Sequence, residues 1–127
     1  MKLLRLKYAF VLCICSLLFS CAKKEPADIL VKKKGTWNYS EEHYYYGTLT
    51  GTKTGKITFE ANGTGTVTSD TGDAAIKWDA TNFTVTIEYY PKEYTYYGIK
   101  EESAKKIVLE NKSIYSPNER LLTLNRK

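Results

Sequence analysis

The chain has 127 residues, of which 19 are Lys or Arg and 14 are Asp or Glu, and its formal net charge is +5. This length suits one small domain and excludes a multidomain enzyme. The charge does not indicate a nucleic-acid-binding surface, because residues 35–127 contain 11 basic and 12 acidic residues and a protein of that class needs a basic groove. We therefore expect no nucleic-acid partner.

Residues 1–20 have the pattern of a targeting segment. Lys2, Arg5 and Lys7 precede an apolar run from Tyr8 to Phe19. The run is too short for a transmembrane helix, which needs about 20 apolar residues to cross the hydrocarbon. We therefore predict that residues 1–20 are a signal peptide.

The end of this run, Leu-Phe-Ser-Cys at residues 18–21, resembles the lipobox of bacterial lipoproteins. The resemblance implies that Cys21 is lipidated and becomes the mature N-terminus, which places the protein in the cell envelope, with the outer membrane as the expected site. The alternative is an ordinary cleaved signal with a chance cysteine. Because Cys13 and Cys15 would leave with the leader, we expect neither thiol catalysis nor a cysteine-ligated metal in the folded part.

Residues 21–34 are predicted to form a basic tether between the anchor and the domain. They contain five lysines, and Pro26 with this charge density is typical of a solvated linker. The lysines serve either to contact an anionic bilayer or simply as a soluble spacer. The apolar triplet at residues 29–31 is expected to dock against the domain as a short turn.

Residues 35–127 are predicted to form an all-β domain. Period-two alternation recurs after residue 35, no helical period is sustained, and all fifteen Thr lie in this part of the chain. Short turns such as Asn62-Gly63 make consecutive strands antiparallel, and an up-and-down meander closes into an eight-stranded barrel without exposed edges. The Gly- and Thr-rich segment 47–55 is predicted as a mobile loop or a long hairpin. The predicted strands cover residues 36–46, 53–60, 64–69, 74–79, 83–90, 94–101, 105–110 and 120–126.

Alternation also predicts which side chains point inward. In the first strand the inward face continues from Tyr39 through Glu41, His43 and Tyr45, so either polar groups line a cavity or a bulge switches the faces. The other residues predicted to point inward are Trp37, Ile57, Phe59, Ile76, Trp78, Phe83, Val85, Ile87, Tyr89, Ile107, Leu109, Leu122 and Leu124.

Gly35-Thr36-Trp37 at the start of the first strand, with a basic residue at the end of the last, resembles the lipocalin-like (calycin-type) barrels. In that superfamily an Arg or Lys packs over the Trp and closes one end of the barrel, which implies this role for Trp37 and Arg126. Together with the lipobox, the hairpin at 57–66 and the terminal segment 122–124, the chain resembles the small lipocalin-like lipoproteins common in Bacteroidota.

Two non-enzymatic hypotheses follow. In the first, the anchored barrel binds a small, mostly apolar ligand. In the second, the barrel is filled, and an exposed patch of Tyr44, Tyr46, Tyr90 and Tyr97 contacts an envelope protein or glycan, although outward tyrosines are also ordinary in a Thr/Tyr-rich sheet. The residues predicted to line the cavity are Tyr39, Tyr45, Phe59, Trp78, Val85, Ile87, Tyr89 and Tyr96.

The sequence lacks the signatures of catalysis. It has no nucleophile elbow, P-loop or dinucleotide fingerprint. His43 is the single histidine, and zinc requires three or four ligands. Adjacent Glu41 and Glu42 point to opposite faces of a strand, so they cannot act as an acid–base pair, and solvated surface charge is the favoured interpretation. We therefore expect a monomer with no enzymatic activity, cofactor or metal.

Overall fold

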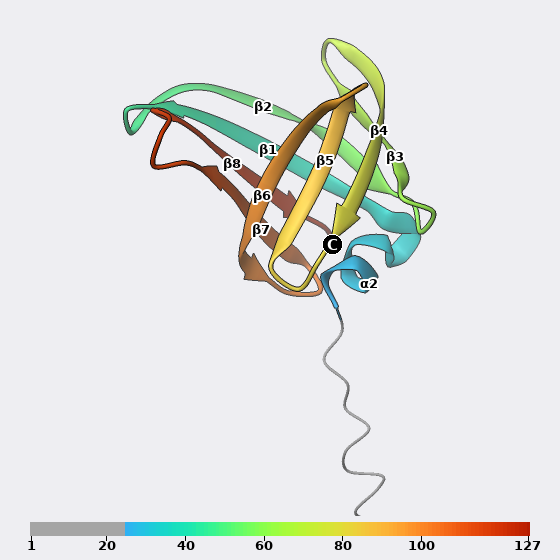
Figure 1. The fold of residues 1–127 in the computed structure, drawn as a ribbon. Coiled ribbons are helices and arrows are strands. Elements are labelled where there is room, and N and C mark those ends of the chain that lie inside the picture. The colour runs from blue at the N-terminus through green and yellow to red at the C-terminus, as the bar shows by residue number, and fades with distance from the viewer. Residues whose placement is uncertain (1–24) are drawn as a thin grey trace, which may run out of the picture.

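The computed structural model describes residues 25–127, so the predicted signal peptide and Cys21 lie outside the described residues. The all-β prediction is confirmed: eight antiparallel strands follow one another around a closed up-and-down barrel, in which β1 also pairs with β8 (Figure 1). The strands are β1 (Thr36–Tyr45), β2 (Thr48–Phe59), β3 (Thr64–Ser69), β4 (Gly72–Ala80), β5 (Thr84–Tyr90), β6 (Glu93–Glu102), β7 (Lys106–Lys112) and β8 (Asn118–Asn125).

Of the two alternatives for segment 47–55, the structure has the long hairpin. β1 and β2 pair up to Tyr45 and Thr48, across a turn in which Tyr46 and Gly47 have φ values of +47° and +76°. Two consecutive positive φ angles are typical of the type I′ turn, whose twist matches that of paired strands. β2 therefore begins five residues before its predicted start.

The folded unit begins before residue 35. Helix α2 (Pro26–Val31) starts with Pro at its first turn, and it is followed by the short 3-10 helix η1 (Lys33–Gly35). Ile29 and Leu30 are buried in the core, so residues 29–31 dock as expected, but within a helix and not as a turn. The expectation of a solvated linker is wrong for residues 26–31, whereas Lys32, Lys33 and Lys34 are exposed. The reason is that α2 covers apolar side chains at the end of the barrel. Within residues 25–127, no helix is long and apolar enough to cross a membrane.

The core occupies the end of the barrel nearest α2, which we call the closed end. Its fully buried side chains come from α2 and from six of the strands, and most of the residues predicted to point inward are among them. The opposite, open end is formed by the turns that join β1 to β2, β3 to β4, β5 to β6 and β7 to β8. The largest fully buried side chains are Leu30, Trp37, Ile57, Phe59, Val85, Ile87, Tyr97, Ile107, Leu109, Leu122 and Leu124.

The faces of β6 are the reverse of those predicted. Tyr97 is fully buried, while Tyr96 is 64% exposed. The pairing of β5 with β6 shifts between Glu88 and Tyr90, so that Val85 lies opposite Tyr97, and paired residues share one face of a sheet. Without this bulge at Tyr89 the register would move by one residue and Tyr96 would point inward.

Phe83 is also placed wrongly by alternation, since it is 79% exposed. It precedes β5, in a turn where the hydroxyl of Thr81 accepts hydrogen bonds from the backbone N–H groups of Phe83 and Thr84 at 3.2 and 3.1 Å. The side chain of Thr81 thus holds a local turn that a strand could not adopt.

The β5–β6 hairpin parts from its neighbours toward the open end. β4 pairs with β5 only over Lys77–Ala80, and β6 pairs with β7 only from Gly98 onward. Residues 89–97 therefore pair only within the β5–β6 hairpin and not with β4 or β7. One side-chain hydrogen bond, from Asn111 Nδ2 to the carbonyl of Tyr96 at 2.6 Å, spans the gap on the β7 side.

Candidate functional site

The closed end is sealed by the two residues that the family resemblance implied. The guanidinium of Arg126 lies 4.0 Å from the ring centroid of Trp37, within cation–π range. Arg126 also donates hydrogen bonds to the carbonyls of Ala104, Lys32 and Ile29 at 2.7, 2.8 and 2.9 Å. The indole N–H of Trp37 donates to the carbonyl of Leu30 at 2.9 Å. Trp37 of β1 and Arg126, which follows β8, thus connect the ends of these strands to α2.

Most of the residues predicted to line a cavity do not do so. Phe59, Val85 and Ile87 are packed in the core. Trp78 is half-buried, packs its ring edge-to-face on Phe59 with centroids 5.3 Å apart, and donates its indole N–H to the carbonyls of the β2–β3 turn. Tyr45 is 50% exposed at the β1–β2 hairpin tip. These side chains fill or flank the barrel and leave no apolar chamber at the closed end.

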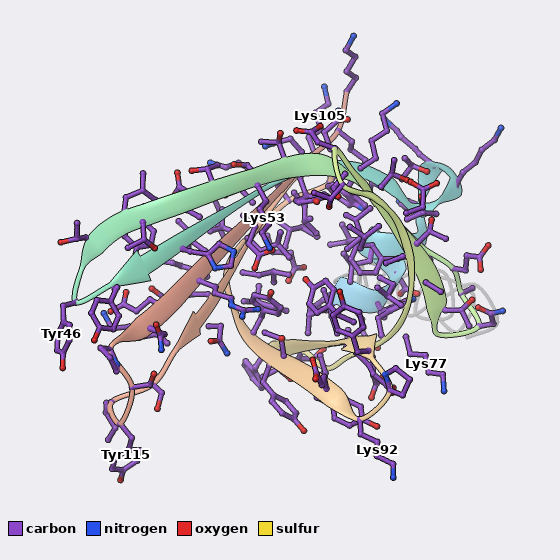
Figure 2. All side chains as sticks on the ribbon, turned by 90° about the horizontal axis from the view of Figure 1, so that it is seen from above. Tyr46, Lys53, Lys77, Lys92, Lys105 and Tyr115 are labelled. Atoms are coloured by element: carbon purple, nitrogen blue, oxygen red, sulfur yellow. The ribbon has the colours of Figure 1, made fainter. Side chains whose placement is uncertain are left out.

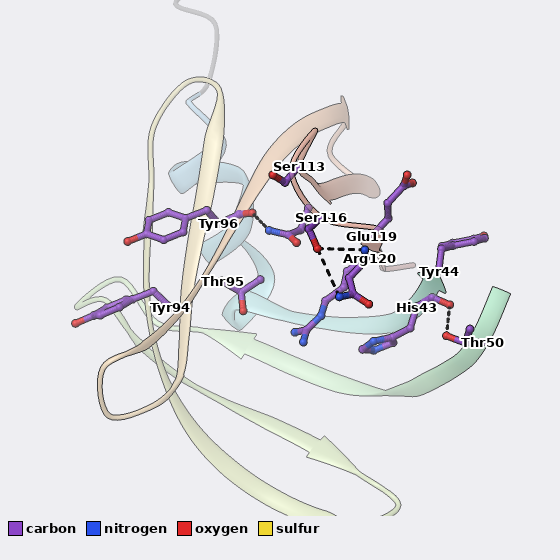
Figure 3. A pocket seen from close by; sticks show the side chains of 12 residues that line it. His43, Tyr44, Thr50, Tyr94, Thr95, Tyr96, Ser113, Ser116, Glu119 and Arg120 are labelled. Carbon is purple, nitrogen blue, oxygen red and sulfur yellow. Dashed lines mark hydrogen bonds between the residues drawn. The ribbon is translucent and has the colours of Figure 1, made fainter. Parts of the chain in front are cut away.

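Above the core, the inner face of the barrel becomes polar. Glu41 of β1 lies opposite Lys53 of β2, and His43 lies opposite Arg120 of β8. Because paired residues share a face, all four point toward the interior, as Figure 2 shows for Lys53 and Figure 3 for His43 and Arg120. Of the two alternatives for β1, polar groups do line a cavity. β1 pairs with β8 without a shift, and the shift in its pairing with β2 comes only between His43 and Tyr44, beyond Glu41 and His43.

Glu41 is the most deeply buried of these polar residues, with 8% of its surface exposed. Its Oε1 lies 3.2 Å from His43 Nε2 and 3.8 Å from Arg120 Nη1. Neither Glu41 Oε1 nor His43 Nε2 has a partner with hydrogen-bond geometry among the described residues. The three side chains therefore form a close polar cluster that includes an ion pair between Arg120 and Glu41, and leaving Glu41 Oε1 without hydrogen-bond geometry costs about 1–3 kcal/mol.

Three tyrosines adjoin the carboxylate, and their hydroxyls remain protonated. The hydroxyls of Tyr89 and Tyr97 lie 3.2 Å apart. Burial, and then the negative charge of Glu41, raise the pKa of Tyr97 to about 12. The pKa of Tyr89 is raised chiefly by burial and by Tyr97, and that of Tyr39 by burial and Glu41. These hydroxyls are therefore neutral hydrogen-bonding groups.

A cavity of about 300 Å³, which we call the upper chamber, lies among these side chains. A second cavity of about 460 Å³ opens between β6 and β8 and shares His43 and Arg120 with the first (Figure 3). Tyr96, predicted to line a cavity, lies on this second one with its ring exposed. Both volumes are of the order found for small-molecule sites. The upper chamber is lined by Tyr39, Glu41, His43, Lys53, Tyr89 and Arg120, among others.

The interpretation of Glu41 as solvated surface charge is wrong, whereas Glu42 on the other face is half-buried and accepts a hydrogen bond from the Tyr44 hydroxyl at 2.7 Å. The sequence feature that pointed to this site was the alternation of β1, which places Glu41 and His43 on its inward face. Sequence reasoning missed Lys53 and Arg120 as their interior partners, because pairing across two ladders was needed to bring them together. Within residues 25–127, no three or more His, Cys, Asp or Glu side chains form a group that could hold a metal ion.

Comparison of the chain with protein-family models, with curated proteins and with solved structures finds no match.

Proposed function

We propose that this protein is a lipocalin-like lipoprotein of the cell envelope that holds a small ligand in the upper chamber of its barrel. The observation that carries the proposal is the cluster of Glu41, His43 and Arg120, which borders a cavity of about 300 Å³ and in which the buried Glu41 Oε1 has no partner of hydrogen-bond geometry. Because the apolar core is filled at the closed end, the ligand needs a polar part as well as an apolar one. This refines the expectation of a mostly apolar ligand.

The proposed lipid anchor would determine which end of the barrel faces the membrane. In the proposed mature protein, residues 22–25 join Cys21 to α2 and can span at most about 14 Å when fully extended. A lipid on Cys21 would therefore hold the closed end near the bilayer. The open end with its chamber would face away from that membrane.

The test is to purify the full chain from native membranes and identify bound small molecules by mass spectrometry. A matched sample carries Ala74→Trp, since Ala74 is exposed and borders the upper chamber. We expect a co-purifying molecule in the wild type that is absent from the variant. The same species at equal occupancy in both samples, or no bound species in either, would argue against a ligand in this chamber.

The anchor is tested separately by substituting the lipidated cysteine. We expect wild type to partition with membranes and Cys21→Ala to be released into the soluble envelope fraction. A variant that remains in the membrane fraction would refute lipidation at this position.

A second candidate, an accessory lipoprotein that contacts a protein or glycan, is favoured by exposed rings at the open end. Tyr46 and Tyr115 are 77% and 91% exposed and project from neighbouring tips (Figure 2), which are joined by a hydrogen bond from the N–H of Tyr46 to the carbonyl of Pro117. The predicted patch must be corrected, because Tyr97 is buried. This role is tested by pull-down from envelope membranes with the wild type and with a double variant, Tyr46→Ser and Tyr115→Ser. The accessory role requires a partner that the wild type retains and the double variant does not.

A further inference from the structure

A third cavity lies on the side of the barrel where β4 and β5 separate. We call it the lateral groove; it has a volume of about 480 Å³ and is bordered by Ala75, Ile76, Tyr89, Tyr90 and Pro91, among others. The pairing of β4 with β5 stops at Lys77 and Glu88, so the groove begins where the ladder ends. Thr64, Lys77 and Glu88 also border the groove, but most of its surface is apolar and therefore suited to an alkyl chain.

The lateral groove adjoins the upper chamber. Tyr89 and Tyr90 border both cavities. On β4, the chamber is bordered by residues up to Ala74 and the groove by residues from Ala75 onward. The two tyrosines therefore stand between the polar chamber and the lateral groove.

The charges around the chamber are balanced. Glu41 and Asp73 oppose Lys53 and Arg120, with His43 beside them. A purely anionic ligand would face the carboxylates of Glu41 and Asp73, and a purely cationic one would face Lys53 and Arg120. A group that carries both signs matches the site, because complementary charges favour a ligand and unmatched ones discriminate against it.

We propose that the upper chamber takes the zwitterionic head group of a single-chain amphiphile, whose apolar chain leaves the barrel sideways between β4 and β5 and lies in the lateral groove. This inference rests on the proposed ligand-binding function and adds the ligand's chemical class and its path. The ammonium N–H groups donate to Glu41, the anionic group accepts from Arg120 and Lys53, and the chain packs against Ile76 and Pro91.

The head group is tested with three probes that share a dodecyl chain: O-dodecylphosphoethanolamine, dodecyl phosphate and dodecylammonium. Affinity is measured by calorimetric titration, below micelle concentrations, on the full chain with Cys21→Ser, which removes only the acylation site. Because the zwitterion makes a charged hydrogen bond that each single-charge probe lacks, it should bind at least about tenfold more tightly than either of them. Glu41→Gln should remove its advantage over dodecyl phosphate. Equal affinities for the three probes would overturn the head-group assignment.

The path of the chain is tested with one substitution at two adjacent exposed positions, Ala74→Trp and Ala75→Trp. In wild type each added methylene should raise the affinity of an O-alkylphosphoethanolamine by up to about fourfold. Ala75→Trp should flatten this dependence and leave the affinity of a butyl probe unchanged, whereas Ala74→Trp should weaken binding at every chain length. Ala75→Glu provides a second block of the groove, and thermal melting verifies that each variant folds.

The two proposals fail in different ways. If Ala74→Trp abolishes binding while both Ala75 variants retain the full chain-length dependence, the chain leaves by another route, and this inference is wrong although the chamber binds ligand. If neither position affects the binding of any probe, the ligand-binding function itself is refuted for this class of molecule.

Discussion

Arg126 connects the last residues of the chain to α2, so truncating it should destabilise the whole barrel. Arg126→Ala removes a cation–π contact at 4.0 Å, worth about 2 kcal/mol when desolvated, and three hydrogen bonds to carbonyls. Because Arg126 is only half-buried, each of those bonds contributes less than the about 1.5–3 kcal/mol of a buried charged one. We expect a loss of about 3–5 kcal/mol in the free energy of unfolding.

Urea unfolding followed by circular dichroism measures this loss, with Lys105→Ala, an exposed side-chain truncation, as the control. Arg126→Lys keeps the positive charge but cannot reach three carbonyls in a planar fork, so it should lose about half as much. Hydrogen exchange of the α2 backbone should accelerate in Arg126→Ala while the β3–β4 hairpin, remote from the contact, changes less. A loss below about 1 kcal/mol, or an unperturbed Arg126→Lys, would refute the role assigned to Arg126.

Two further predictions concern buried positions. The pKa of Tyr97 is raised to about 12, so the folded state holds this proton more tightly than the unfolded state; the resulting stability is present below pH 10 and lost as the pH rises to about 12. Tyr97→Phe should therefore reduce the stability loss between pH 10 and 12 by about 2–3 kcal/mol, and parallel alkaline unfolding curves for the two proteins would contradict this. Gly35→Ala would place a Cβ 1.9 Å from the carbonyl oxygen of Phe59 at a φ of +65°, and should lower the free energy of unfolding by at least about 3 kcal/mol. Gly47→Ala, in open space at a φ of +76°, should lower it by only about 1–2 kcal/mol. Thermal melting of the two variants tests this difference.

The strand order and most of the core could be predicted from the sequence because alternation and turn residues act locally. The faces of β6 could not, since tyrosines occupy both sides of Tyr94–Tyr97 and alternation cannot choose between them. The choice depends on the bulge at Tyr89, which shifts the register by one residue. Helix α2 was expected only as a docked turn, since lysines flank its short apolar triplet and its stability comes from covering the closed end.

Only part of the candidate site could be predicted from the sequence. Alternation predicts that Glu41 and His43 point inward, yet buried charges are rare enough that surface exposure was the natural interpretation of the glutamate. The compensating cations lie on β2 and β8, 12 and 79 residues away from Glu41. Only closure of the barrel, which pairs β1 with both strands, brings Lys53 and Arg120 to the same interior face.

The hydrogen bond from Arg126 to the carbonyl of Ile29 joins residues 97 positions apart, and this separation would matter in the export that we propose. Neither the β1–β8 pairing nor this contact can form until nearly the whole chain has emerged, because the partners of the first helix and strand come last. Such non-local contacts form slowly. A chain in transit through a translocation channel would therefore stay unfolded until its end arrives, and the barrel would close only on the far side.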